Sequence, residues 1–205
     1  MANNRVSLRR THLFIAAIAL AAQLHTWAQA PGRELLNSER IAATFGSYGV
    51  EVLEQNGTVR VSNLFSGEGE KRVTRTFAVV RYAPQLDPAV SDEHAAIVAG
   101  GSIGAVFAAQ GWEVRKTHLH YGERPATAKL ASLMRVAVGA PLAEHLYVLD
   151  VVKNGRVIEY AALVEVHHPD YLGLPALAAI YGEPTSQGRS ELIAALQATA
   201  AERER

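Results

Sequence analysis

Two hydrophobic segments joined by a two-residue turn constrain the fold of this chain more than any other feature. Residues 146–153 and 156–167 are rich in Val, Leu and Tyr, and Asn154-Gly155 lies between them. Asn and Gly accept the positive φ angles that tight hairpin turns require, so this pattern predicts an antiparallel β-hairpin. Any fold for the chain must therefore include an antiparallel sheet that contains these two strands.

The rest of the chain places groups of strands between helices. Further strands are expected at residues 50–53 and 58–65, joined by Gln55-Asn56-Gly57, and at 73–82 and 112–121. Helices are expected at 38–45, 87–99, 103–110, 126–137, 174–181 and 190–205. Ser38 is the expected N-cap of the first helix, and the last four residues of the final helix, 202–205, are expected to be solvated. Because helices separate groups of strands rather than following each strand, the expected fold class is α+β, with a mostly antiparallel sheet and flanking helices.

Two of the expected strands carry charged residues among apolar ones. Side chains alternate between the faces of a strand, so Arg75 shares a face with Val73, Phe77, Val79 and Arg81. On the last strand the same rule groups Val157, Glu159, Ala161, Leu163, Glu165 and His167. A buried guanidinium or carboxylate needs a partner or a ligand, which makes Arg75 and Glu165 candidate functional residues. The alternatives are that Arg75 is a solvated surface residue and that Glu165 forms a structural ion pair with Arg75 or Arg81.

The N-terminus has the pattern of a bacterial secretory signal peptide. Arg5, Arg9 and Arg10 precede the apolar stretch 13–24, and the small residues of Ala28-Gln29-Ala30 follow it. We therefore expect residues 1–30 to be a signal peptide, residues 31–205 to form a single domain, and the protein to be periplasmic or secreted. An uncleaved membrane anchor is the alternative, although polar residues interrupt the apolar stretch.

Composition excludes several classes of protein. With 49% hydrophobic and 20% charged residues, the chain has a globular rather than a disordered composition. Its 20 basic and 20 acidic residues cancel, and loss of the three arginines of residues 1–30 would leave a net charge of −3. Binding to nucleic acids depends on clustered Lys and Arg, so no nucleic-acid partner is expected. The chain has no Cys, so its core alone must stabilise an exported form.

The order of these elements, together with several short motifs, resembles the chorismate lyase-like superfamily, which includes chorismate pyruvate-lyase and the UTRA effector-binding domain of bacterial transcription regulators. The motifs are Ser102-Ile103-Gly104, Gly111-Trp112, Gly139-Ala140-Pro141-Leu142, Asn154-Gly155 and Leu163-Val164-Glu165-Val166-His167-His168-Pro169. The likeness to the UTRA type is best over residues 102–172, and no helix-turn-helix precedes this region. The likeness to the lyase extends toward the N-terminus, through the expected helix with Ile41 and the strand that begins Thr74-Arg75-Thr76.

This resemblance implies a binding site for a flat carboxylate. Arg75 would receive the carboxylate, Glu165 would contact the ring hydroxyl, Ile103 and Gly104 would cover the ring, and Ile41 would line the opposite wall. Arg81 or Lys116 would bind a second carboxylate of the ligand. The sequence departs from the lyase at Val164 and at His167-His168. The implied function is release of pyruvate from chorismate or a related enolpyruvyl acid to give a hydroxybenzoate, and the alternative is non-catalytic binding of a small aromatic carboxylate.

Two other chemistries have weaker support in the sequence. His118 and His120 alternate on one strand, and a neighbouring strand with His167-His168 would complete a group of imidazoles such as zinc sites use. No His-Glu-x-x-His motif is present, so neither a metal nor a cofactor is expected. Gly100-Gly101-Ser102-Ile103-Gly104 matches the Gly-x-Ser-x-Gly pattern of hydrolases, but that motif needs a strand before the serine, and the preceding residues are expected to form a helix.

Overall fold

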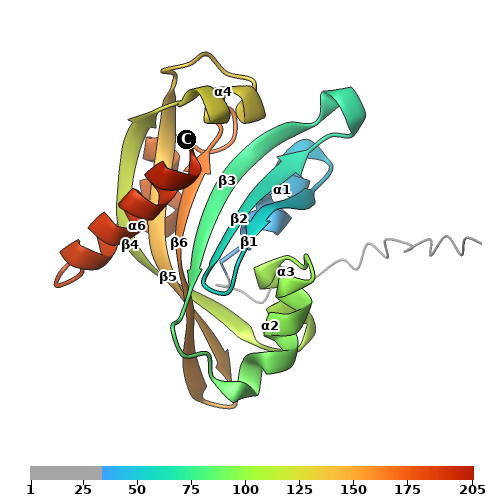
Figure 1. Ribbon diagram of the computed structural model, residues 1–205, viewed down its shortest axis with the longest axis vertical. Helices are drawn as coiled ribbons and strands as arrows, with labels where there is room; N and C mark the ends of the chain where they lie inside the picture. Colours follow the sequence, from blue (N-terminus) through green and yellow to red (C-terminus); the bar gives the residue numbers. More distant parts are fainter. Residues whose placement is uncertain (1–33) are drawn as a thin grey trace, which may run out of the picture. The chain divides into compact units, whose positions relative to one another are not determined.

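A single six-stranded antiparallel sheet organises residues 34–205, the part of the chain that the computed structural model describes (Figure 1). The strands are β1 (Gly49–Gln55), β2 (Val59–Ser66), β3 (Val73–Tyr82), β4 (Glu113–Pro125), β5 (Pro141–Lys153) and β6 (Arg156–His167). Their order in the sheet is β1-β2-β3-β6-β5-β4, and every neighbouring pair is antiparallel. The α+β class expected from the sequence is confirmed. The expected signal peptide lies outside the described residues.

Helices cover both faces of this sheet. They are α1 (Asn37–Phe45), α2 (Ser91–Val98), α3 (Ile103–Ala109), α4 (Ala128–Met134), α5 (Leu174–Tyr181) and α6 (Ser190–Arg203), with short 3₁₀ helices at Gly69–Lys71 and Pro88–Val90. Residues Leu35–Arg205 form one compact unit. Among the described residues, no helix is long and apolar enough to span a bilayer.

The core has two main layers, one on each face of the sheet. On one face, Phe77, Val79, Val164 and Val166 belong to a buried cluster with residues of α4 and α6. On the other, Val80, Leu149 and Leu163 belong to a second cluster with Ile97 of α2 and Phe107 of α3. We call this second side the cavity face, because alternate residues of the strands line a cavity there. Burial on both faces explains why the central strands are almost continuously apolar.

The hairpin that dominates the sequence is present with the expected turn. Asn154 and Gly155 both have positive φ, at 52° and 78°, as a tight hairpin turn requires. β5 begins at Pro141 rather than at residue 146, so pairing with β6 extends to Ala143 and includes His145. The strand is thus five residues longer at its start than expected, and this extension adds to the site.

Two local features differ from expectation for identifiable reasons. The turn between β1 and β2 uses no positive φ; instead the Asn56 side-chain oxygen accepts hydrogen bonds from the backbone N–H groups of Thr58 and Val59. Helix α1 begins at Asn37, so Ser38 is not its N-cap. The Glu39 carboxylate accepts a hydrogen bond from the backbone N–H of Leu36, which precedes the helix, at 2.8 Å.

A β-bulge changes which residues of β6 face the core. Across β5, Leu149 pairs with Ala161 but Asp150 pairs with Glu159, so Tyr160 is the extra residue of the bulge. Up to the bulge Ile158 and Tyr160 are buried, whereas Val157 is 57% exposed. After it the odd-numbered residues lie on the cavity face. The single face expected for residues 157–167 is therefore wrong for Val157 and Glu159 and holds only from Ala161 onward.

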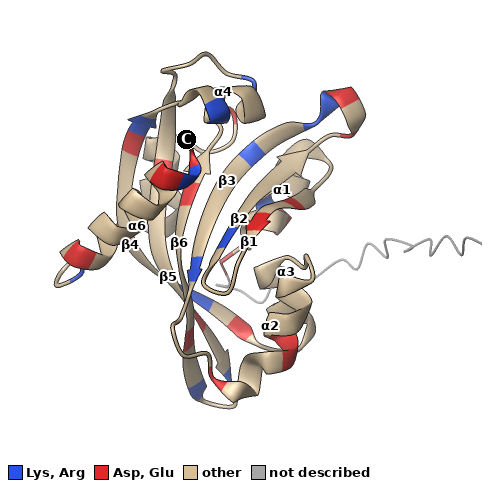
Figure 2. Ribbon diagram, viewed as in Figure 1, with Lys and Arg blue, Asp and Glu red and all other residues tan. Residues whose placement is uncertain are grey.

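The four charged residues at the end of the chain are not all solvated: Glu202 and Arg205 are exposed, whereas Glu204 is buried (Figure 2). The Glu204 carboxylate lies 2.8 Å from the Arg124 guanidinium, which also contacts Glu144 at 2.9 Å, and Glu204 is only 2% exposed. Burial raises the pKa of Glu204 to about 7, against the opposing attraction of Arg124. The carboxylate is therefore protonated more readily in the folded protein than in the unfolded chain.

The raised pKa of Glu204 predicts that the folded protein loses stability as the pH rises. Because the folded-state pKa of Glu204 is higher than its unfolded-state pKa, its favourable contribution is complete below about pH 4 and is lost as the pH rises toward 7. We expect the free energy of unfolding, measured with urea at pH 5 and pH 8, to fall by about 2 kcal/mol more in the wild type than in Glu204→Gln. Glu202→Gln, at an exposed position two residues before Glu204, should behave like the wild type.

Candidate functional site

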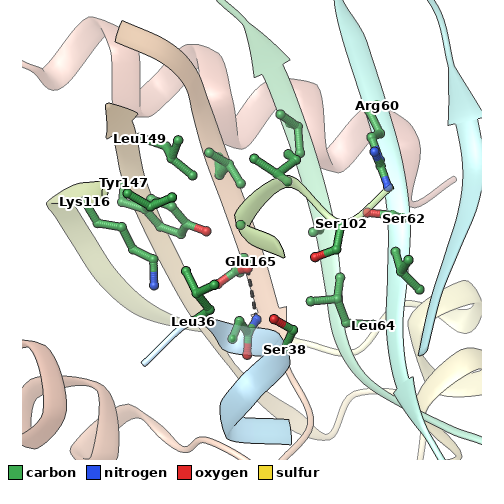
Figure 3. Close-up of a pocket in the computed structure, with 18 of the residues that line it drawn as sticks. Leu36, Ser38, Arg60, Ser62, Leu64, Ser102, Lys116, Tyr147, Leu149 and Glu165 are labelled. Carbon is green, nitrogen blue, oxygen red and sulfur yellow. Dashed lines mark hydrogen bonds between the residues drawn. The ribbon is translucent and has the colours of Figure 1, made fainter. Parts of the chain in front are cut away.

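A cavity of about 70 Å³ lies on the cavity face, between the sheet, the start of α1 and the α2–α3 turn (Figure 3). Its lining is mostly apolar, with polar groups at a few places. The lining residues are Leu36, Asn37, Ser38, Tyr48, Val50, Arg60, Ser62, Leu64, Ala78, Val80, Ser102, Ile103, Gly104, Val114, Lys116, Tyr147, Leu149, Leu163 and Glu165. One water needs roughly 10–15 Å³ of such volume, so the cavity has room for a small organic molecule.

Arg60 is the buried cation of this cavity. It is 1% exposed, and its Nη1 donates hydrogen bonds to the backbone carbonyls of Ile97 and Gly101, at 2.7 and 2.9 Å. Its Nε has no hydrogen-bond partner among the described residues, and none of their carboxylates forms an ion pair with it. A buried guanidinium with only neutral acceptors carries an uncompensated positive charge, which favours an anionic ligand.

Glu165 of β6 lines the same cavity and is 4% exposed. Its Oε1 accepts a hydrogen bond of 3.0 Å from Asn37 Nδ2, which connects the strand to α1 (Figure 3). Asn37 Nδ2 also donates to Thr76 Oγ1 at 3.2 Å, and the Tyr171 hydroxyl donates to Asn37 Oδ1. The carboxylate is thus positioned by a buried polar network that originates in three different elements.

Ser102 lies at the start of α3, where its Oγ accepts a hydrogen bond of 3.2 Å from the Tyr48 hydroxyl. Helix α2 ends four residues earlier, at Val98. The strand–turn–helix geometry of a hydrolase nucleophile elbow is therefore missing around this serine, as the helical pattern of the preceding residues had indicated. Burial raises the pKa of Tyr48, so its hydroxyl remains a hydrogen-bond donor.

Four of the seven residues expected at the site line the cavity, and three do not. The lining residues among them are Ile103, Gly104, Lys116 and Glu165. Arg75 lies elsewhere: its Nε donates to Ser66 Oγ at 2.9 Å, and its guanidinium lies 3.8 Å from the centroid of the Phe45 ring. Arg81 is exposed and lines no part of the cavity. Of the two residues expected to hold a second carboxylate, only Lys116 lines it.

The pairing of β3 with its neighbours explains why Arg75 and Glu165 do not meet. Glu165 pairs directly with Ala78, so Arg75 lies three residues away along β3. Arg75 is also the extra residue of a β-bulge, because Leu64 pairs with Thr76 and Phe65 pairs with Thr74, and the alternation of faces expected around it does not hold there. Its guanidinium lies against Phe45 at the end of α1, whereas the cavity meets the start of that helix. The expected carboxylate-binding role of Arg75 is therefore not supported by its position.

Ile41 is fully buried but does not line the cavity. The cavity meets the first turn of α1, at Leu36, Asn37 and Ser38, and Ile41 follows one turn later in the core. Ile41 was expected to line this wall and does not; residues closer to the start of the helix line it instead.

Arg60 and His145 were missed by the sequence reasoning. Arg60 stands between Val59 and Val61 on a strand whose residues are mostly buried, the same signal that drew attention to Arg75. His145 lies within the unexpected extension of β5. It contacts His118, with Nδ1 of His118 and Nε2 of His145 2.8 Å apart, and lies near His167. Burial lowers the pKa of His145 and lowers that of His167 to about 3, so both imidazoles are neutral at pH 7.

No family model matches the sequence, and none of the curated proteins matches it. Solved structures resemble it in part. One is the ligand-binding domain of a proposed GntR-family transcriptional regulator from Bordetella bronchiseptica, with a TM-score of 0.43 and 11% identity, covering 62% of this chain and 89% of that one. Another is the C-terminal domain of PhnF, with a TM-score of 0.39 and 14% identity over 69% and 79% of the two chains.

A third is the C-terminal domain of a histidine utilization repressor from Pseudomonas syringae pv. tomato str. DC3000. It has a TM-score of 0.39 and 11% identity, and the match covers 62% of this chain and 96% of that one. Similarity at this level does not assign the chain to a family or give it a ligand. The chemistry of the site therefore follows from its own residues.

Proposed function

We propose that this protein binds a small organic carboxylate with an apolar body in the cavity on the cavity face. The observation that carries the proposal is Arg60, a fully buried guanidinium that lines the cavity and has no carboxylate partner among the described residues. The planar fork of an arginine suits a carboxylate, to which it donates parallel hydrogen bonds. Apolar walls such as Leu64, Val80 and Leu163 favour a ligand whose remaining surface is hydrophobic.

A ligand with two acidic groups has additional support. Lys116 and Arg60 extend from opposite sides of the cavity, and Glu165 lies between them (Figure 3). This arrangement suits a molecule with a carboxylate at each end and a hydroxyl in the middle. It fits the resemblance to the chorismate lyase-like superfamily, in which we propose to place the chain, with Arg60 rather than Arg75 as the cation that receives a carboxylate.

Catalysis on such a ligand is the second function that these residues favour. In an enolpyruvyl acid such as chorismate, the ring carbon–oxygen bond breaks, the neighbouring ring carbon loses a proton, and the departing enolpyruvate takes up a proton to become pyruvate. Aromatisation of the ring drives this reaction, so few catalytic groups are needed. Glu165 would contact the ring hydroxyl, and the two cations would hold the carboxylates.

The binding function predicts that Arg60 is essential for affinity. Removing charged hydrogen bonds in Arg60→Met should weaken binding of 4-hydroxybenzoate and chorismate, measured by isothermal titration calorimetry, about 10–100-fold. Arg81→Met removes an exposed arginine from a neighbouring strand and should bind like the wild type. Thermal melts of both variants establish that they are folded. Equal affinity in Arg60→Met and wild type would refute the proposed function.

The catalytic function makes a separate prediction. Wild-type protein incubated with chorismate should release pyruvate, detected with a coupled dehydrogenase assay, and Glu165→Gln should reduce the rate about 10²–10⁴-fold. Glu159→Gln, which changes an exposed carboxylate of the same strand outside the cavity, serves as the control. Tight binding of chorismate without pyruvate release would contradict catalysis while leaving the binding function intact.

We further propose that the domain acts outside the cytoplasm, on the basis of the basic, apolar and small-residue pattern of residues 1–30. When the full chain is expressed in a Gram-negative host, a shortened product should collect in the periplasmic fraction, with its new N-terminus near residue 31. A full-length product in the cytoplasmic fraction would show that export is wrong.

A further inference from the structure

Three buried side chains of types that can bind metal ions lie close together next to the cavity. His145 of β5 pairs directly with Glu165 of β6, and His167 follows Glu165 by two residues on the same strand, so all three side chains lie on the same face. His145 and His167 are 0% exposed, and Glu165 is nearly as buried. Neither histidine lines the cavity, whereas Glu165 does. The sheet register alone therefore brings two imidazoles and a carboxylate together.

The facing atoms of this cluster do not satisfy one another. His145 Nδ1 lies 4.0 Å from Glu165 Oε2, and His167 Nε2 lies 3.9 Å from the same oxygen. These separations are too long for hydrogen bonds, which have donor–acceptor distances of about 2.7–3.2 Å. Both nitrogens are buried and have no hydrogen-bond partner among the described residues. Two orphaned polar atoms in a protein interior are costly unless something occupies the space between them.

A metal ion fits the space that these atoms enclose. The three candidate ligand atoms lie within 4.8 Å of one another. Zinc lies about 2.0–2.2 Å from histidine nitrogens and carboxylate oxygens, which places tetrahedral ligand atoms roughly 3.4 Å apart. The side chains need to approach by only about half an ångström on average to reach that geometry.

The far side of each ligand is already held by another residue. His145 Nε2 lies 2.8 Å from His118 Nδ1, and His167 Nδ1 lies 3.0 Å from Thr76 Oγ1. Glu165 Oε1 accepts the hydrogen bond from Asn37. If each histidine donates through this outer nitrogen, its inner nitrogen presents a lone pair to the centre of the cluster. Outer hydrogen bonds of this kind orient the ligands of metal sites.

We propose that His145 Nδ1, His167 Nε2 and Glu165 Oε2 bind one divalent first-row transition metal ion of the zinc class. A site of two imidazoles and one carboxylate binds such ions in preference to Ca²⁺ or Mg²⁺. Three protein ligands leave a coordination position open, and Glu165 places that position at the end of the cavity. The positive charges of Lys116 and Arg40 act on His167, so an anion is favoured as the fourth ligand. The metal site shares Glu165 with the proposed catalytic function, but it does not use Arg60 and so does not depend on the proposed binding of a carboxylate.

The test measures metal binding by the untagged full chain after removal of metal with a chelator. Zn²⁺ affinity is measured by competition with a chromophoric chelator, and Co²⁺ provides a ligand-field absorption spectrum that reports the coordination geometry. We expect one ion per chain and a tetrahedral or five-coordinate Co²⁺ spectrum. His145→Gln and His167→Gln should each weaken Zn²⁺ binding at least 100-fold. Thr76→Val removes the outer hydrogen bond of His167 and an acceptor of Asn37 but no ligand atom, and it should weaken binding about 10-fold.

His120→Gln is the matched control, because this strand histidine contributes no atom to the cluster and should leave affinity unchanged. Circular dichroism shows whether each variant folds. Should a ligand variant unfold, the stoichiometry and Co²⁺ spectrum of the wild type still decide the question. Wild-type protein that binds no ion, or ligand variants that bind as tightly as His120→Gln, would overturn the site. Arg60→Met should retain metal binding. The metal site can therefore be tested even if the proposed carboxylate binding proves wrong.

Discussion

The pairing of β6 with its two neighbours determines the arrangement of the whole site. Glu165 pairs with Ala78 of β3 on one side and with His145 of β5 on the other. The first pairing places the carboxylate on the cavity face beside Ala78, and the second brings it to an imidazole. A shift of one residue in either pairing would turn a side chain to the opposite face. The position of Glu165 in the cavity and its grouping with His145 and His167 both follow from this register.

Burial of charged groups is tolerated here because helices supply polar partners. The carbonyls at the end of α2 and before α3 accept hydrogen bonds from Arg60, and Asn37 at the start of α1 donates to Glu165. Backbone groups near helix ends lack partners within the helix and are available for such contacts. Neutral partners reduce the cost of desolvation without cancelling the charge. The cavity thus retains a positive charge at Arg60 that a bound anion would neutralise.

The sequence predicts the elements of this fold better than it predicts the site. The boundaries of β3, β6 and α5 agree with expectation, because apolar alternation, the Asn154-Gly155 turn and Pro169 mark them locally. The site depends on which strands are neighbours and in which register, and neither is encoded locally. Arg75 and Arg60 have similar sequence surroundings, yet only Arg60 reaches the cavity. The bulge at Tyr160 likewise reverses the faces of β6 without any glycine or proline to signal it.

Glu165 connects the two proposed sites and gives them a common physical basis. Its Oε1 is held by Asn37 of α1, and its Oε2 faces His145 and His167. An ion at the cluster would draw Oε2 toward the histidines and away from the cavity, which would enlarge the space next to Lys116 and add positive charge at that end. Arg60 and the ion would then provide two positive centres, one on each side of an apolar cavity. A ligand with two anionic groups would complement this distribution of charge better than a ligand with one.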